Sequence, residues 1–136
     1  MPVTPNSIVT PQTPRANVVN VAAANATYST SPTNTQLLVT AGPNGARLTK
    51  LQAIPCETIT SANQLQVFRS ADGGTTRHLA DSALMGVYTM AQTTEAPTTD
   101  FGYSDDSPVI LQPNERLYVA EGQAKSVNFI AEWADY

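Results

Sequence analysis

The sequence predicts an all-β domain, a sandwich or barrel of short strands, preceded by an extended N-terminal arm. Three observations support this fold class. Short segments rich in Val, Ile, Thr and Tyr recur from residue 17 onward, separated by turn-forming Gly, Pro, Asn and Ser residues. No stretch sustains a helical period for more than about two turns. The length of 136 residues suits one domain with its own hydrophobic core.

Residues 1–16 differ from the rest of the chain and form the predicted arm. Their prolines are Pro2, Pro5, Pro11 and Pro14. Proline at this spacing blocks helices and central strands and favours an extended path, which would reach on the order of 50 Å. Val3, Ile8 and Val9 are apolar side chains for which a solvated tail has no use. A disordered tail is the alternative for the isolated chain.

Residues 17–136 form the predicted β-domain. In its last segment, apolar residues occupy alternate positions from Val127 to Trp133, which puts them on one face of a strand. Ile130 breaks this alternation and suggests that the outer face is partly covered. Residues 78–85 hold the only helix-like pattern and are predicted to form a loop or a single turn. The predicted strands span residues 18–22, 36–40, 46–54, 64–69, 75–79, 84–90, 109–112, 116–120 and 126–133.

The segment SADGGTTRH, residues 70–78, is predicted to be a structural turn. A phosphate-binding loop needs spaced glycines, a following lysine and a helix start, and this segment has none of them. Gly73 and Gly74 supply the positive φ that a tight hairpin requires, and Asp72 can accept hydrogen bonds from the amides of the turn. We therefore expect strand, turn and strand in this region.

Composition excludes several classes of partner. Charged residues make up 13% of the chain, the net charge is -4, and the seven Lys and Arg residues are scattered, which argues against nucleic-acid binding. No apolar run is long enough to span a bilayer, and no secretion signal is recognisable at the N-terminus. Cys56 is the only cysteine, so no internal disulfide is expected and a reducing compartment is favoured. The glycosylation sequon at residues 25–27 is then interpreted as coincidental.

Two groups of residues raise the question of chemistry. Cys56 and His78 could form a nucleophile and base, yet no third orienting group is visible, and a buried, inert thiol is the favoured interpretation. The acidic loop at residues 93–108 fits no calcium-binding pattern, so we expect a solvated loop with no metal. No cofactor is predicted. Phe101 and Tyr103 are expected to dock this loop, and Trp133 is consistent either with closure of the core or with a subunit contact.

Several phrases of the sequence resemble small virion structural proteins of tailed bacteriophages. The resemblance covers most of residues 17–136 and contains no catalytic motif. It implies a head decoration (cement) protein, which would be a jelly-roll-like β-sandwich, often a homotrimer, seated on the lattice of the major capsid protein. The phrases are GARLTKL (45–51), FRSADGGT (68–75), AQTT (91–94), DFGYS (100–104) and EWADY (132–136).

The functional expectation is a non-enzymatic protein that decorates and stabilises a phage capsid. It would be made in the host cytoplasm and lie on the capsid surface, with no nucleic-acid or membrane partner. Head, neck and tail positions all stay open. The alternative is a carbohydrate-binding or tail-fibre module, which would need an aromatic platform such as Tyr88, Phe101 and Tyr103. The expected capsid or subunit contacts are Val3, Ile8, Val9, Pro11, Pro14 and Arg15.

Overall fold

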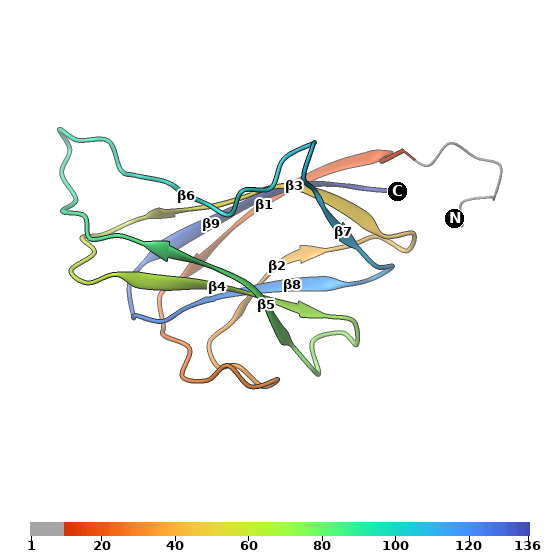
Figure 1. Cartoon of the computed structure of the whole chain (residues 1–136), viewed down its shortest axis with the longest axis horizontal. Helices are drawn as coiled ribbons and strands as arrows, with labels where there is room; N and C mark the ends of the chain where they lie inside the picture. Colours follow the sequence, from red (N-terminus) through yellow and green to blue (C-terminus); the bar gives the residue numbers. More distant parts are fainter. Residues whose placement is uncertain (1–9) are drawn as a thin grey trace.

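A computed structural model describes residues 10–136 of the chain. These residues form nine β-strands and no helix, arranged as two antiparallel sheets packed face to face (Figure 1). The predicted class, an all-β sandwich, is confirmed. The strands are β1 (Thr13–Val21), β2 (Gln36–Thr40), β3 (Ala46–Pro55), β4 (Asn63–Ser70), β5 (His78–Met85), β6 (Thr99–Asp100), β7 (Val109–Leu111), β8 (Arg116–Glu121) and β9 (Val127–Asp135).

The first sheet, here called sheet A, has the order β1-β9-β3-β6, and β7 also pairs with β3. Strand β9 lies in its middle and pairs along its whole length with both β1 and β3. Strand β1 is an edge strand. It contains Pro14, which is tolerated there because an edge strand need not donate on its outer side.

The second sheet, sheet B, has the order β2-β8-β4-β5. Strand β8 pairs with β2 on one side and with β4 on the other, and β5 forms the far edge. The core lies between the two sheets and holds fully buried side chains from both, among them Leu51 and Phe129 of sheet A and Leu65 and Val119 of sheet B. Trp133 belongs to this core, so it closes the sandwich.

The structure differs from the sequence-based expectation in several segments. The strands predicted at residues 75–79 and 84–90 are replaced by the single strand β5, and residues 75–77 and 86–90 lie outside the strands. Strand β1 begins at Thr13, so residues 13–16 belong to the sandwich and not to the arm, because they pair with β9. Residues 78–85 form strand β5 instead of a loop or turn, because β4 supplies a full-length partner. Most side chains of β5 are exposed, so its sequence lacks the apolar alternation of a half-buried strand.

The loop between β1 and β2 covers the part of the outer face of sheet B formed by β4 and β8, and it runs beneath the sheet in Figure 1. On the same face, Leu79 and Leu84 of the edge strand β5 stay exposed. Asn25 anchors this loop. Its amide nitrogen donates to Gln66 Oε1 at 2.8 Å and to the Thr27 carbonyl at 2.7 Å, and its oxygen accepts from the Thr33 N–H at 2.8 Å. Gln66 and Phe68, on the covered face, are almost fully buried. The sequon asparagine is therefore a buried structural residue.

The predicted turn at residues 72–74 is confirmed as structural. Asp72 accepts from the Thr76 N–H at 2.9 Å and from the Ser70 hydroxyl at 2.9 Å, and these two hydrogen bonds lower the pKa of its carboxyl group. Gly73 and Gly74 have φ values of 76° and 96°, in the region that favours glycine. A side chain on Gly74 would also collide with the hydroxyl of Tyr118.

Candidate functional site

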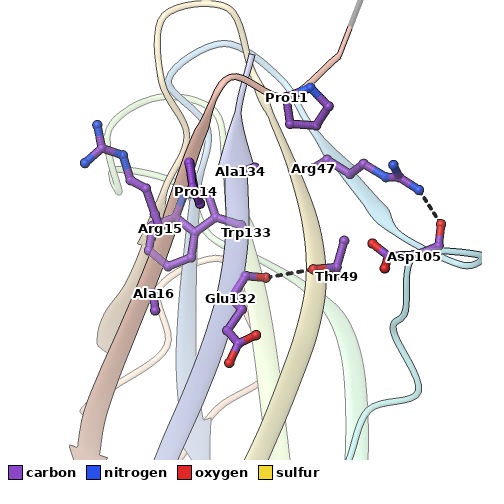
Figure 2. Close-up of a pocket in the computed structure, with 10 residues that line it drawn as sticks. All are labelled: Pro11, Pro14, Arg15, Ala16, Arg47, Thr49, Asp105, Glu132, Trp133 and Ala134. Atoms are coloured by element: carbon purple, nitrogen blue, oxygen red, sulfur yellow. Dashed lines mark hydrogen bonds between the residues drawn. The ribbon is translucent and has the colours of Figure 1, made fainter.

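A groove of about 600 Å³ lies on the outer face of sheet A. Strands β1, β9 and β3 form its floor, and the loop before β7 forms one wall (Figure 2). We call it the sheet A groove. Its lining residues are Pro11, Pro14, Arg15, Ala16, Arg47, Thr49, Asp105, Glu132, Trp133 and Ala134.

Charges of both signs lie along the groove. The guanidinium of Arg47 donates to the main-chain carbonyl of Asp105, which ties the wall to β3. Glu132 forms an ion pair with Lys50 at 3.5 Å, and both side chains are largely exposed. An exposed pair of this kind contributes little to stability. The groove thus presents small apolar side chains between balanced charges, with no strong field of one sign.

The structure brings together the described members of the predicted contact set. Pro11, Pro14 and Arg15 all line the sheet A groove. Val3, Ile8 and Val9 lie outside the described residues. The predicted contact role of these residues stays a prediction.

Arg15, one of the predicted contact residues, has a carboxylate partner within its own chain. Its Nε lies 2.6 Å from Asp135 Oδ2, and the other oxygen of Asp135 accepts from the Gly42 N–H at 3.0 Å. The Arg15 side chain remains 54% exposed. A second partner can therefore still reach it from solvent.

Cys56 and His78 do not form a catalytic pair. Cys56 follows β3 and lies near the start of β4, whereas His78 pairs with Arg69, six residues further along β4. At about 3.3 Å per residue, the two side chains lie roughly 20 Å apart. Cys56 is exposed, which contradicts the expectation of a buried thiol, because the strand ends at Pro55 and Cys56 begins a surface loop.

The acidic loop is docked by its aromatic residues, as predicted. Phe101 and Tyr103 are partly buried and pack against the core, and the Tyr103 hydroxyl donates to Asp81 of β5. Burial, reinforced by this hydrogen bond, raises the pKa of Tyr103. These two rings therefore do not join Tyr88 in an exposed sugar-binding platform. Within residues 10–136 no cluster of three or more His, Cys, Asp or Glu side chains is arranged to hold a metal ion.

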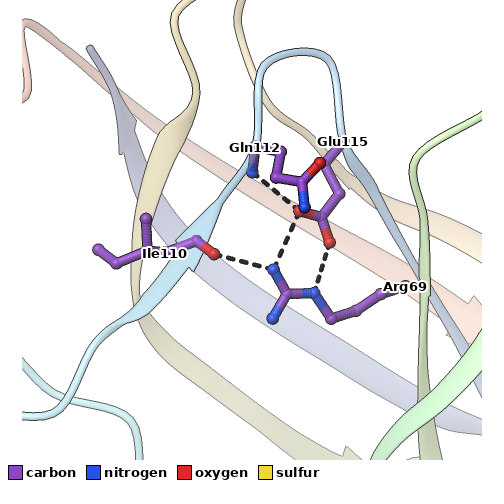
Figure 3. Close-up of polar contacts among 4 residues, drawn as sticks. All are labelled: Arg69, Ile110, Gln112 and Glu115. Atoms are coloured by element: carbon purple, nitrogen blue, oxygen red, sulfur yellow. Dashed lines mark hydrogen bonds and ion pairs between the residues drawn. The ribbon is translucent and has the colours of Figure 1, made fainter.

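A buried ion pair ties sheet B to β7 and to the turn that follows it (Figure 3). Arg69 contacts both oxygens of Glu115, and its Nη2 also donates to the Ile110 carbonyl at 2.8 Å. The Gln112 N–H donates to Glu115 at 2.8 Å. Burial alone would raise the pKa of Glu115, but Arg69 and the Gln112 N–H hold it below its usual value. This cluster is satisfied internally, so its role is structural.

Sequence analysis did not anticipate Glu121, a fully buried carboxyl at the end of β8. It accepts from Asn63 Nδ2 at 3.1 Å and from the Lys125 N–H at 2.9 Å. Burial is the main cause that raises its pKa to about 7, and the nearby charge of Glu57 adds to the effect. No local pattern marks this residue, because its burial depends on how β4 and β8 pair.

The comparisons with known proteins bear on the fold alone. No protein-family model matches the chain, and no curated protein matches it. Among solved structures it is similar to Eiger TNF from S. frugiperda, with a TM-score of 0.50 and 10% sequence identity. The alignment covers 93% of this chain and 96% of the other. The likeness supports a jelly-roll-like β-sandwich. Separately, residues 10–136 contain no helix long and apolar enough to cross a membrane.

Proposed function

We propose that this chain is a non-enzymatic virion structural protein that decorates a phage capsid by binding the lattice of the major capsid protein. In this proposal it acts as a homotrimer on the capsid surface and is made in the host cytoplasm. The decoration stabilises the particle by adding contacts between neighbouring capsid subunits. Such a role needs shape and repeated weak contacts, and it needs no reaction.

The observation that carries the proposal is the sheet A groove at the root of the N-terminal segment. Pro11, Pro14 and Arg15 line it, and the segment that precedes them holds the apolar residues Val3, Ile8 and Val9. Apolar residues on an extended segment gain little in isolation and more against the surface of a partner. The resemblance of the sequence to phage decoration proteins supplies the identity of that partner.

A second feature supports a role on a surface. Charged residues are scarce, and the groove carries balanced charges. Many copies on a lattice raise the effective concentration of each contact, so that individually weak contacts suffice. The Arg69–Glu115 cluster is satisfied by hydrogen bonds within the chain, and Cys56 lies far from His78, which supports a role that needs no reaction.

The test is reconstitution on capsids prepared without this protein. Purified chain is added to these capsids, bound protein is measured by co-sedimentation, and release of packaged DNA is followed during heating. We expect saturable binding and a higher temperature of DNA release for decorated particles. If the chain does not bind these capsids at any micromolar concentration, the proposed function is wrong. Val87→Lys is a suitable control for nonspecific loss, because Val87 is exposed and lies outside the groove.

A further inference from the structure

The two outer faces of the sandwich are covered to different degrees. Chain segments of the same copy bury Gln66, Phe68 and Ala120 on the outer face of sheet B. On sheet A, the outward-facing side chains of β1 are exposed, with Val18 at 56% exposure. Val18 pairs with Ile130 of β9, whose side chain points outward beside it and is only half-buried. Val18 is thus open to solvent, and Ile130 is partly so.

The path of the chain into β1 indicates which segment could cover Val18 and Ile130. The Gln12 N–H donates to the Asp135 carbonyl at 2.7 Å, so the pairing with β9 continues one residue beyond the start of β1. The side chain of Gln12 also donates to the Thr10 carbonyl at 3.0 Å. Pro11 has a fixed φ and keeps the residue before it extended. The chain therefore enters the sandwich along the axis of β1, from beyond the end of the groove.

This direction matters because the groove runs the other way. From Pro11 it extends alongside Pro14 and Ala16, following β1 further into the sheet. For residues 1–9 to cover the Val18–Ile130 pair beside the groove of their own copy, the chain would have to reverse its direction just before Thr10. The reversal would use several of the nine residues and leave too few to reach Val18. A segment that arrives from another copy meets no such requirement.

We propose that residues 2–9 of one copy lie in the sheet A groove of a second copy, so that copies are joined by exchanged arms. At about 3.1 Å per residue, these eight residues reach roughly 25 Å. From Pro14 to Val18, β1 spans about 13 Å, so the arm is long enough to cover this stretch and to bridge between copies. The inference concerns how copies join, and it does not depend on whether a capsid is the further partner.

The side chains of residues 2–9 are chemically complementary to the sheet A groove and the face beside it. Residues 2–9 carry no charged side chain, and the groove presents Arg47 and Glu132 in balance, so neither surface repels the other. The arm holds three apolar residues, and the face beside the groove offers Val18 and Ile130 as their contacts. The arm of a second copy would add to the partial cover that Ile130 already receives within its own chain.

Disulfide trapping tests the exchange directly. All variants carry Cys56→Ser, since Cys56 is exposed and would compete. A chain with Ile8→Cys is mixed with a size-tagged chain carrying Ile130→Cys and oxidised under mild conditions. We expect a disulfide-linked pair of different chains. The matched control replaces Ile130→Cys by Val87→Cys, at a 68% exposed position away from the groove, and should give at least about tenfold less product.

A double variant with Ile8→Cys and Ile130→Cys in one chain separates the two possible arrangements. Exchange predicts linked pairs at concentrations where the protein associates, and free thiols after strong dilution. An internal disulfide that persists at every dilution would show that the arm occupies its own groove and would overturn the inference. Equal yields with Ile130→Cys and Val87→Cys would overturn it as well.

Sedimentation supplies a measurement that needs no cysteine. The full chain should associate, and deletion of residues 2–9 or the substitution Val18→Lys should raise the dissociation constant at least about tenfold. Val87→Lys should leave it unchanged. Circular dichroism checks that each variant is folded. Should the deleted chain associate as tightly as the full one, arm exchange is excluded. If copies exchange arms but do not bind capsids, the proposed capsid decoration is wrong and the arm exchange still stands.

Discussion

Sheet A and sheet B have similar inner faces and different outer ones. On sheet B, the loop anchored by Asn25 lies over the sheet, and Phe68 is fully buried without belonging to the core between the sheets. On sheet A, the outer face shows Val18 and Glu132 to solvent. The outer face of sheet B is thus closed over β4 and β8 and open at β5, where Leu79 and Leu84 are exposed, whereas that of sheet A is open along β1. The difference is created by loop length and sequence.

The two outer faces differ in how their polar side chains are satisfied. A face covered within the chain buries its polar side chains and satisfies them with internal hydrogen bonds, as Asn25 and Gln66 do. The outer face of sheet A instead keeps side chains that tolerate water. On sheet A these are a few branched apolar residues among charges and small residues. Substitutions on the covered part of the outer face of sheet B should therefore lower the free energy of unfolding. Substitutions on the outer face of sheet A should mainly change association between copies.

The largest contrast is expected for the apolar residues of the two outer faces. Phe68→Ala should lower the free energy of unfolding by about 3–5 kcal/mol, because it leaves a cavity where a fully buried ring had been. Ile130→Ala, on the open face, should cost less than about 1 kcal/mol. Urea unfolding of chains dilute enough to be monomeric measures both values. Similar losses for the two variants would contradict the assignment of open and closed faces.

A second contrast concerns the carboxyl groups of the two sheets. Glu121 of sheet B has a pKa raised to about 7 from an ordinary value of 4.5. Between these values the folded state holds a proton that the unfolded state has released. Stability should therefore fall as pH rises from 4.5 to 7, by about 1 kcal/mol per pH unit, and change little from this cause above pH 7.

Glu121→Gln should abolish this slope, whereas Glu132→Gln, at an exposed position on sheet A, should preserve it. The measurement is the unfolding midpoint in urea at a series of pH values. Midpoints that do not change between pH 5 and pH 7 in the parent chain would show that Glu121 is ionised without penalty.

Asparagines provide the third contrast. Asn25→Ala should lower the free energy of unfolding by about 2 kcal/mol, because it leaves Gln66 Oε1 and the Thr33 N–H without their partner in a buried site. Asn128→Ala removes only an exposed hydrogen bond with Asn20 and should cost less than about 0.5 kcal/mol. Thermal melting compares the two variants. An unchanged melting temperature for Asn25→Ala would mean that the loop contributes nothing to the cover of sheet B.

The smallest contrast is internal to sheet B and uses its adjacent glycines. Both Gly73 and Gly74 have positive φ, so alanine at either is strained by about 1 kcal/mol. At Gly74 the added Cβ would also lie 2.2 Å from the Tyr118 hydroxyl, whereas nothing lies within 4 Å at Gly73. Gly74→Ala should therefore be the more destabilising by about 1 kcal/mol. Equal melting temperatures would show that Tyr118 moves aside without cost.

Elements with a strong local signal were predictable from the sequence. Residues 36–40 were expected as a strand and form β2, and the turn at Asp72 was read from its glycines. Strand β5 was missed, because it lies at an edge and its pattern resembles a helical turn. Strand β6 is only two residues long and exists through its pairing with β3.

The sheet A groove could not be predicted from local sequence either. It forms because β9 lies between β1 and β3, and this order follows from pairing between residues far apart in the chain. Pro11, Pro14 and Arg15 were singled out by composition, but Arg47 and Asp105 could not be joined to them without the topology. Ile130 carried the one local hint, because it broke an otherwise regular alternation.

The central position of β9 has a consequence for synthesis of the protein. It is the last of the nine described strands to leave the ribosome, yet β1 and β3 both pair with it, and β8, also late, holds β2 and β4 together. Before residue 127 is made, the first strand, β1, has no neighbour in its sheet. Neither sheet can be completed before β8 and β9 have been made, so assembly must wait for these two strands. A nascent chain that pauses earlier would expose unpaired strand edges to solvent and depend on chaperones for protection.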